Sequence, residues 1–164
     1  MNGNEVIFKS KQCYARLFND SDIDDFMTYR NDLKWMTHQG FKGLTRKEFE
    51  KALLRKSSFD EGIQLAVTRK SDDKIIGDLY IKKDGSYYWI GYTINPAYKR
   101  KGYTSGIVGA MVEWIMDQGG LRVLAEMDSN NIPSIRLIEK AGFTKLKEDR
   151  ETVIYARDCM RREL

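Results

Sequence analysis

Apolar residues at every second position mark a series of short strands in the first and middle parts of the chain. We expect strands at Cys13–Phe18, Gly62–Arg69, Lys74–Lys82 and Ser86–Ile94. Short polar turns separate the last three segments, Ser71-Asp72-Asp73 before one and Asp84-Gly85 before the next, as is typical of strands joined by hairpins. The pattern therefore predicts an antiparallel meander in the middle of the chain.

Apolar residues at helical spacing mark two helices before the meander. The first is predicted to start at Asp20 and Ser21, because Ser21 and Asp24 have the spacing of a capping box. The second is predicted to start at Thr45, where Glu48 completes the same motif. We expect it to end near residues 56–58.

The part of the chain after Ile94 alternates helices and strands. A third helix carries an apolar stripe that includes Ile107, Met111 and Ile115, and the pair Gly119-Gly120 suits its end. The following elements are a strand at Leu121–Met127, a helix capped by Asn131 and closed by Gly142, and a hairpin of Phe143–Lys147 and Glu151–Ala156. The whole pattern predicts a mixed α+β domain around one sheet, and we expect residues 1–164 to form a single domain.

The composition narrows the class of protein. The 164 residues are 41% hydrophobic and 32% charged with a net charge of +4, which fits a globular domain with a mildly basic surface. No apolar run reaches the roughly 20 residues that a bilayer crossing needs, and the first residues lack the apolar core of a secretory leader. We therefore expect a cytoplasmic protein without a membrane partner.

Metal and disulfide chemistry are not expected. Cys13 and Cys159 lie at opposite ends of the chain, a pattern that suits packing residues in a reducing compartment. His38 is the single histidine, and catalytic zinc and most iron sites use two or more imidazoles. The sequence therefore predicts no metal ligands.

A glycine-containing basic segment joins the last strand of the meander to the third helix. It contains Lys99, Arg100, Lys101 and Gly102. The free amide groups and positive dipole end of a helix N-terminus bind phosphate, and glycine lets the backbone approach closely. The plain alternative is a solvated loop with a turn glycine. The nucleotide motifs GxxxxGK[ST] and GxGxxG are absent, so the segment predicts an anion site of another kind.

A second helix start carries Asn131 and Ser134 and follows the next strand. If the two preceding strands pair in parallel, both helix starts lie at the same edge of the sheet and form a cleft. The plain alternative is that Asn131 and Ser134 only cap the helix.

Together these segments resemble the GNAT superfamily of N-acetyltransferases, in particular the branch of ribosomal-protein N-terminal alanine acetyltransferases. The family loop Q/R-x-x-G-x-G/A corresponds to the run Lys99, Arg100, Lys101, Gly102, Tyr103 and Thr104, with Lys99 and Thr104 departing from the pattern. The family motif N-x-x-S/A followed by Gly-Phe is matched by Asn131, Ser134, Gly142 and Phe143. The resemblance implies a mostly antiparallel twisted sheet of about seven strands, about four flanking helices, and a parallel pair splayed at a cofactor cleft.

The resemblance also implies acetyl-CoA as co-substrate and assigns roles to residues. The loop 99–104 would bind the pyrophosphate, and Asn131 would lie near the pantetheine arm. A backbone amide at a bulge near Thr93 and Ile94 would stabilise the oxyanion. Many members place a tyrosine acid where this chain has Ile138, so Ser134 becomes the candidate acid and Glu126 the candidate base; a water chain is the alternative to Glu126.

The acceptor stays open at this point: a peptide or protein N-terminus, or a small-molecule amine such as an antibiotic or a polyamine. Trp35, His38 and Phe41 could form an aromatic wall, and acids near Asp20 could attract an amine; the alternative is that these aromatics are core and these acids only offset the helix dipole. Monomer and homodimer are both compatible with the family. The alternatives to an enzyme are a catalytically silent CoA-binding module and, less favoured, a nucleic-acid-binding domain that uses the basic run with Tyr98 and Tyr103.

Overall fold

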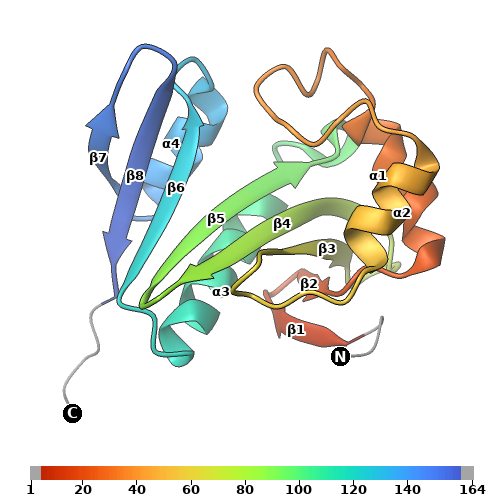
Figure 1. Ribbon diagram of the computed structural model, residues 1–164, viewed down its shortest axis with the longest axis horizontal. Coiled ribbons are helices and arrows are strands. Elements are labelled where there is room, and N and C mark those ends of the chain that lie inside the picture. Colours follow the sequence, from red (N-terminus) through yellow and green to blue (C-terminus); the bar gives the residue numbers. More distant parts are fainter. Residues whose placement is uncertain (1–4, 160–164) are drawn as a thin grey trace.

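The computed structural model describes residues 5–159, which form one sheet with helices on both faces (Figure 1). The strands are β1 Val6–Lys9, β2 Cys13–Arg16, β3 Ile63–Arg69, β4 Ile75–Asp84, β5 Tyr87–Ile94, β6 Arg122–Asp128, β7 Thr144–Glu148 and β8 Thr152–Asp158. Their spatial order is β1-β2-β3-β4-β5-β6-β8-β7. Every neighbouring pair is antiparallel except β5 and β6, which are parallel. The predicted α+β class, the meander and the parallel pair are confirmed.

The eight strands of the described chain compare with about seven expected. The strand without a predicted counterpart is β1, a four-residue edge strand whose pairing with β2 shifts register between Val6 and Phe8. Only Phe8 of this strand is buried. Such a short strand with one buried residue has no clear two-residue period, so its sequence did not reveal it.

In the part of the chain that the structure describes, four α-helices flank the sheet: α1 Ile23–Arg30, α2 Arg46–Leu54, α3 Tyr103–Asp117 and α4 Ile132–Lys140. Short 3-10 turns precede two of them, η1 Asp20–Asp22 and η2 Pro96–Tyr98. The predicted capping box of α2 is confirmed, because Thr45 Oγ1 accepts from the Glu48 amide at 3.2 Å and Glu48 Oε1 accepts from the Thr45 amide at 3.1 Å.

The predicted capping box at Ser21 and Asp24 is wrong. The Asp22 carboxylate instead accepts from the amide of Asn19 at 2.8 Å, and the chain makes the 3-10 turn η1 before α1 begins at Ile23. The tighter turn moves the cap two residues toward the N-terminus. The sequence offers four possible caps in a row here, and spacing alone did not separate them.

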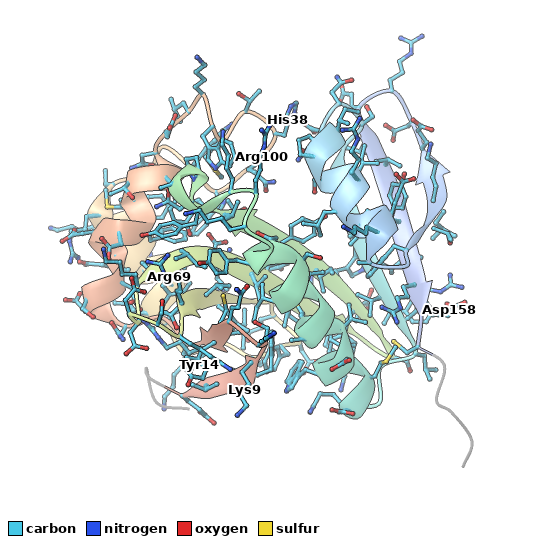
Figure 2. The ribbon with its side chains drawn as sticks, turned by 180° about the vertical axis from the view of Figure 1, so that it is seen from behind. Lys9, Tyr14, His38, Arg69, Arg100 and Asp158 are labelled. Carbon is cyan, nitrogen blue, oxygen red and sulfur yellow. The ribbon has the colours of Figure 1, made fainter. Side chains whose placement is uncertain are left out.

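Two apolar clusters lie on opposite faces of the sheet. Successive residues of β3 show the division, because Leu65 packs with α3 and α4 whereas Ala66 packs with α1 and α2. Figure 2 shows α3 and α4 on the face seen from behind. Within residues 5–159, none of the helices has both the length and the apolar character that a bilayer crossing requires.

The parallel strands β5 and β6 separate halfway along their length. Their ladder runs from the pair Tyr87 and Arg122 to the pair Ile90 and Ala125 and ends there. Beyond that point β5 stays paired with β4 as far as Ile94, and β6 stays paired with β8 as far as Asp128. Figure 1 shows the two strands side by side at one end and apart at the other. The sheet therefore opens between two strands that each keep one partner.

Candidate active site

The end of β5 presents backbone groups to this opening. The amide of Asn95 donates to the carbonyl of Ile76 on β4 at 2.8 Å. Because successive residues of a strand point their amides to opposite sides, Thr93 also faces β4, whereas Tyr92 and Ile94 face the opening. Of the two amides expected to stabilise an oxyanion, the one of Ile94 is therefore directed to the opening.

The expected bulge near Thr93 and Ile94 is not found. The pairing of β4 with β5 keeps one register from Asp84 to Gly77, and the irregularity lies instead between β3 and β4, after Val67. The two strands approach closely here, because a Cβ on Gly77 would lie 2.4 Å from the Thr93 carbonyl oxygen. The opening thus arises from the end of the β5 and β6 ladder and not from a bulge in β5.

The basic segment forms the turn between η2 and α3. Arg100 and Gly102 both have left-handed backbone conformations, with φ of 61° and 80°, and Gly102 is the N-cap of the 15-residue helix α3. Glycine has no side chain to cap the first amides, so these amides remain available to an anion. Lys99 lies over the Trp35 ring, with its Nζ 5.4 Å from the ring centre.

Four of the predicted cofactor residues meet where β5 ends and α3 begins. Thr93, Ile94, Tyr103 and Thr104 all border a small void of about 10 Å³. Arg100 and the neighbouring Lys101 and Gly102 lie on the turn that follows Lys99. The structure therefore brings the end of β5 and the start of α3 together, as the sequence predicts.

At the start of α4, Ser134 is bonded across the opening to Tyr92. Asn131 caps the helix, and its side-chain oxygen accepts from the Ser134 amide at 3.4 Å. The Ser134 hydroxyl donates to the Tyr92 hydroxyl at 2.9 Å, and the Tyr92 hydroxyl donates to the Ser134 carbonyl at 3.0 Å. Burial raises the pKa of Tyr92 to about 12, although the Ser134 hydrogen bond acts in the opposite direction. The Tyr92 hydroxyl is therefore protonated near neutral pH.

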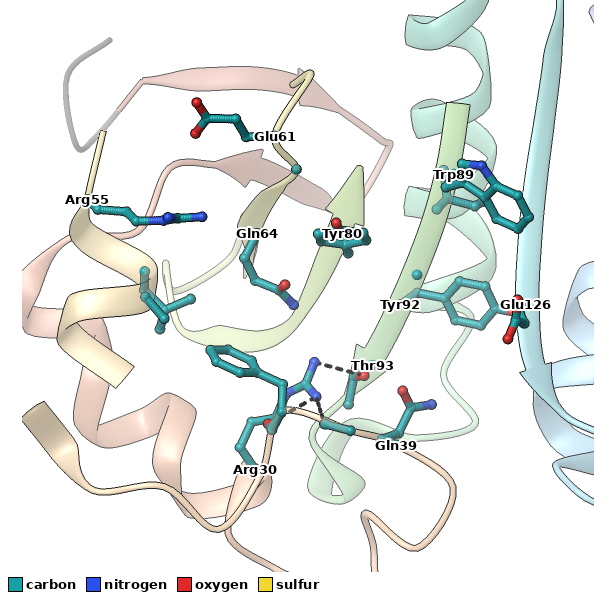
Figure 3. Close-up of a pocket in the computed structure, with 17 residues that line it drawn as sticks. Arg30, Gln39, Arg55, Glu61, Gln64, Tyr80, Trp89, Tyr92, Thr93 and Glu126 are labelled. Carbon is teal, nitrogen blue, oxygen red and sulfur yellow. Dashed lines mark hydrogen bonds between the residues drawn. The ribbon is translucent and has the colours of Figure 1, made fainter. Parts of the chain in front are cut away.

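A cavity of about 540 Å³ lies beside the end of β5, on the side of α1 and α2 (Figure 3). Its lining residues include Trp89, Tyr92 and Thr93 from β5 and the predicted base Glu126 from β6. Glu126 is exposed, and it has no ion-pair partner among residues 5–159. Ser134 and the loop 99–104 do not line this cavity, so Tyr92 and Thr93 connect the two groups of predicted residues.

A buried polar network that sequence reasoning missed supports the wall of the cavity. Arg30 Nη2 lies 2.5 Å from Asp78 Oδ1 and donates to Thr93 Oγ1 at 3.1 Å, while Arg30 Nη1 donates to the Gly40 carbonyl at 3.0 Å. Burial lowers the pKa of Arg30, but the interactions with Asp78 and Tyr29 together outweigh burial, and the pKa is raised. The side chains of Arg30 and Asp78 are 5% and 0% exposed. No sequence signal links residues 48 positions apart, so this pair emerges only from the fold.

The loop between α1 and α2 brings the predicted aromatic residues to different places. The Trp35 indole Nε1 donates to the carbonyl of Ile94 at 2.8 Å, and Phe41 packs at 5.2 Å from the Phe49 ring while also bordering the cavity. His38 Nδ1 lies 3.0 Å from Asp128 Oδ2 at the end of β6. Trp35 and His38 therefore contact the ends of β5 and β6, whereas Phe41 packs against the apolar cluster beside the cavity, so the three do not form one wall.

The acids near Asp20 do not face the cavity. Asp22 is paired with Arg16 through two contacts of 2.7 Å, and Asp24 lies 3.2 Å from Arg46. Asp20 is 3.7 Å from the same arginine, and none of these acids lines the cavity. The structure therefore favours the interpretation that they support the helix start.

Comparisons with known proteins agree with this geometry. A family model described as the acetyltransferase (GNAT) domain matches residues 14–144. The chain belongs to the GNAT acetyltransferase family. A Bacillus subtilis (strain 168) relative named uncharacterized N-acetyltransferase YnaD is 30% identical over 139 residues, which cover 83% of this chain and 81% of that protein. The predicted family and the predicted enzyme class, N-acetyltransferase, are thus confirmed.

Solved structures of the GNAT fold match almost the whole chain. A GNAT acetyltransferase from Bacillus anthracis has a TM-score of 0.77 at 22% identity and covers 92% of this chain and 97% of its own. The ribosomal L7/L12 α-N-protein acetyltransferase RimL in complex with coenzyme A has a TM-score of 0.79 at 14% identity, with 94% and 98% covered. At these identities the likeness concerns the fold, and members of this family use acetyl-CoA.

Proposed function

We propose that this GNAT protein transfers the acetyl group of acetyl-CoA to the α-amino group of a peptide or protein N-terminus. The observation that supports this most strongly is the position of Tyr92. It lines the cavity that contains Glu126, and its hydroxyl is hydrogen-bonded to Ser134 at the start of α4, across the opening between β5 and β6. A thioester held beside the end of β5 would therefore meet an amine that enters from the cavity. We also propose that residues 1–164 act as one acetyltransferase domain, since a single sheet extends from Val6 to Asp158.

The residues around the opening suit acetyl-CoA. The uncapped amides at Gly102 and the charges of Lys99, Arg100 and Lys101 fit a pyrophosphate. The backbone of Tyr92, which faces the opening, offers hydrogen-bonding groups to the amides of a pantetheine arm near Asn131. When bound, acetyl-CoA supplies the acetyl group as a thioester.

We assign a role to each residue at the reacting end of the site. The amide of Ile94 donates to the oxyanion that develops when the amine attacks the thioester carbonyl. The Glu126 carboxylate accepts the proton that the amine loses as the C–N bond forms. The Ser134 hydroxyl donates to the sulfur, which keeps the electron pair of the breaking C–S bond.

The cavity favours an α-amine over a lysine side chain. Attack requires a neutral amine, and an α-amino group has a pKa near 7.7 to 8.0, compared with about 10.4 for lysine. Among the described residues, Glu61 and Glu126 are the carboxylates that line the cavity, and no histidine lines it. A site with only carboxylates as bases is better matched to an amine that is already partly neutral near pH 7.5. The RimL neighbour is named as an α-N-protein acetyltransferase, which agrees with this assignment.

Release of free CoA thiol from acetyl-CoA tests the proposal. Three acceptors are compared at pH 7.5: a peptide with a free N-terminus and no lysine, the same peptide with a blocked N-terminus and one internal lysine, and the polyamine spermidine. We expect fast release only with the first peptide, and a slower rate with the Glu126→Gln protein. Release only with spermidine would assign the enzyme to small amines, and no release with any acceptor while CoA binds would indicate a silent CoA-binding module.

A further inference from the structure

Ser134 is proposed to donate a hydrogen bond to the leaving sulfur, but its hydroxyl is already hydrogen-bonded to Tyr92. Ser134 Oγ lies 2.9 Å from the Tyr92 hydroxyl, and this is its single hydrogen-bond partner within the described chain. A hydroxyl carries only one hydrogen. When the Ser134 hydroxyl donates to Tyr92, its hydrogen is directed at Tyr92 and is not available to a sulfur atom.

The Tyr92 hydroxyl can free the Ser134 hydrogen without any movement of heavy atoms. It lies 3.0 Å from the Ser134 carbonyl oxygen and 2.9 Å from Ser134 Oγ, so both of its possible acceptors belong to the same residue. Rotation of the phenolic hydrogen from the carbonyl to Oγ lets Tyr92 donate to the serine hydroxyl. The Ser134 hydrogen is then free to turn toward a third acceptor.

We propose that Tyr92 is a positioning residue that releases the Ser134 hydrogen toward the departing sulfur, an inference that rests on the proposed acetyl transfer. The C–S bond breaks, the sulfur keeps the electron pair, and Ser134 donates a hydrogen bond to the resulting thiolate. Tyr92 donates to Ser134 at the same time, and a chain of donors that point the same way is stronger than its separate members.

Tyr92 keeps its proton throughout this step. Its pKa of about 12 lies well above the value near 8.5 of an alkyl thiol, so complete proton transfer to the thiolate is unfavourable. The amine loses a proton as the C–N bond forms, and this proton passes to Glu126. The reaction therefore balances without a proton from Tyr92. Tyr92 therefore acts by orienting a hydrogen bond and not as a proton donor.

Within residues 5–159, Tyr92 is the one side chain hydrogen-bonded to the Ser134 hydroxyl. Ile138, one turn further along α4, is buried and apolar, and the side chain of Asn131 already accepts from the Ser134 amide. Tyr92 reaches Ser134 from β5, on the opposite side of the opening. Strand β5 thus supplies, through Tyr92, the hydrogen-bond donor that α4 lacks at Ile138.

A double-mutant cycle on kcat tests the inference. The proteins are wild type, Tyr92→Phe, Ser134→Ala, the double variant and the control Tyr87→Phe, which removes an exposed hydroxyl at the other end of β5. A hydrogen bond to a charged group corresponds to a fall of about 10- to 100-fold in kcat. We expect such a fall in both single variants, no further fall in the double variant, and unchanged kcat for the control.

Binding and rescue separate this role from a structural one. We expect the Kd for CoA and the KM for acetyl-CoA to stay within about twofold of wild type in Tyr92→Phe, because the lost hydrogen bond affects only the departing thiolate. Ser134→Thr keeps the hydroxyl, so it should retain most of kcat when Tyr92 is present and lose it in combination with Tyr92→Phe.

Several results would overturn the inference. A wild-type kcat in Tyr92→Phe, independent losses that multiply in the double variant, or a loss confined to CoA affinity would leave Tyr92 a purely structural residue. A Ser134→Thr enzyme as slow as Ser134→Ala would also contradict the inference. This comparison does not depend on whether the Tyr92→Phe protein folds. Wild-type protein that releases no thiol with any acceptor would instead overturn the proposed function, and this inference with it.

Discussion

Gly102 is the residue on which binding of the cofactor phosphates depends most directly. Its φ of 80° lies in the left-handed region, and a Cβ built on it meets no other atom within 4 Å. Position 102 therefore requires glycine for two reasons. Its backbone is left-handed, and a side chain would fill the space that a phosphate would occupy. A β-branched side chain at this position is strained and also covers the free amides at the start of α3.

We expect Gly102→Val to weaken CoA binding by tenfold or more while the protein remains folded. Isothermal titration calorimetry with CoA measures the affinity, and thermal unfolding checks the fold. Gly109→Ala is the matched control, since Gly109 lies inside α3 and a Cβ there meets nothing within 4 Å. Undiminished CoA affinity in Gly102→Val would show that the phosphates bind elsewhere.

The buried Arg30 connects a helix, a loop and two strands. It contacts Asp78 on β4, Thr93 on β5 and the Gly40 carbonyl, and Asp78 also accepts from Tyr29 at 2.5 Å and from Gln64 at 2.5 Å. Removing one partner of a buried ion pair leaves an uncompensated charge, which costs about 3 to 5 kcal/mol.

We expect Arg30→Met to lower the free energy of unfolding by about 3 kcal/mol or more, as measured by urea denaturation. Arg46→Met is the control, because Arg46 is 40% exposed and pairs with exposed Asp24 and with Glu50 on the surface. Surface pairs contribute at most about 1 kcal/mol. Equal losses in the two variants would contradict the importance of the Arg30 network.

At the scale of elements, the start of α2 depends on its capping box. The reciprocal bonds between Thr45 and Glu48 satisfy two amides that otherwise have no partner in the helix. Phe49 then anchors the helix in the apolar cluster against Phe26 and Phe41. The cap therefore helps to hold the helix whose residues Ala52 and Leu53 border the cavity.

We expect Thr45→Ala to lower the free energy of unfolding by about 1 kcal/mol. Urea denaturation measures the change, and Ser57→Ala, beyond the end of α2, is the matched control with no expected effect. A loss in the control equal to that of Thr45→Ala would contradict the role of the cap.

The whole molecule is expected to lose stability at alkaline pH. Burial raises the pKa of Tyr92 to about 12 and raises that of Tyr29 well above its ordinary value, with Asp78 adding to the effect on Tyr29. Both hydroxyls stay protonated in the folded state after those of the unfolded chain begin to ionise near pH 10. Their contribution to stability is thus complete below pH 10 and is lost as the pH rises toward the folded-state values.

Urea unfolding at several pH values from 8 to 11 tests this expectation. We expect a constant contribution from these tyrosines up to about pH 10 and a decline above it, with a shallower decline in Tyr92→Phe. Tyr87→Phe, at an exposed position, should follow the wild-type profile. The same decline in Tyr92→Phe and wild type would show that Tyr92 titrates normally.

Local patterns allowed much of the molecule to be predicted from its sequence. The meander and helices α2, α3 and α4 follow from residues close in the chain, and so do the caps at Thr45 and Asn131. The meeting of β5 with the start of α3 follows as well, because a short turn joins the two. The parallel pair of β5 and β6 was implied by the family resemblance and not by a local pattern. The edge strand β1 and the 3-10 turn at Asp20 carry weaker local signals and were missed or displaced.

The contacts that define the site depend on the tertiary fold. The pair of Arg30 and Asp78 joins α1 to β4, and the pair of Tyr92 and Ser134 joins β5 to α4 across 42 positions. Neither pair has a fixed spacing that a motif could reveal. Glu126 lies on β6 and lines the cavity, and its role as the base is still a prediction.

The central claim, that the opening between β5 and β6 holds acetyl-CoA, is tested most directly by thermal unfolding with acetyl-CoA, CoA and ATP. A ligand at about 100 times its Kd stabilises the folded state by roughly 2.7 kcal/mol, which raises the Tm of a protein of this size by about 5 to 10 °C. We predict such a rise with acetyl-CoA and CoA and none with ATP, and a smaller rise in Gly102→Val. An unchanged Tm with all three ligands would contradict the claim.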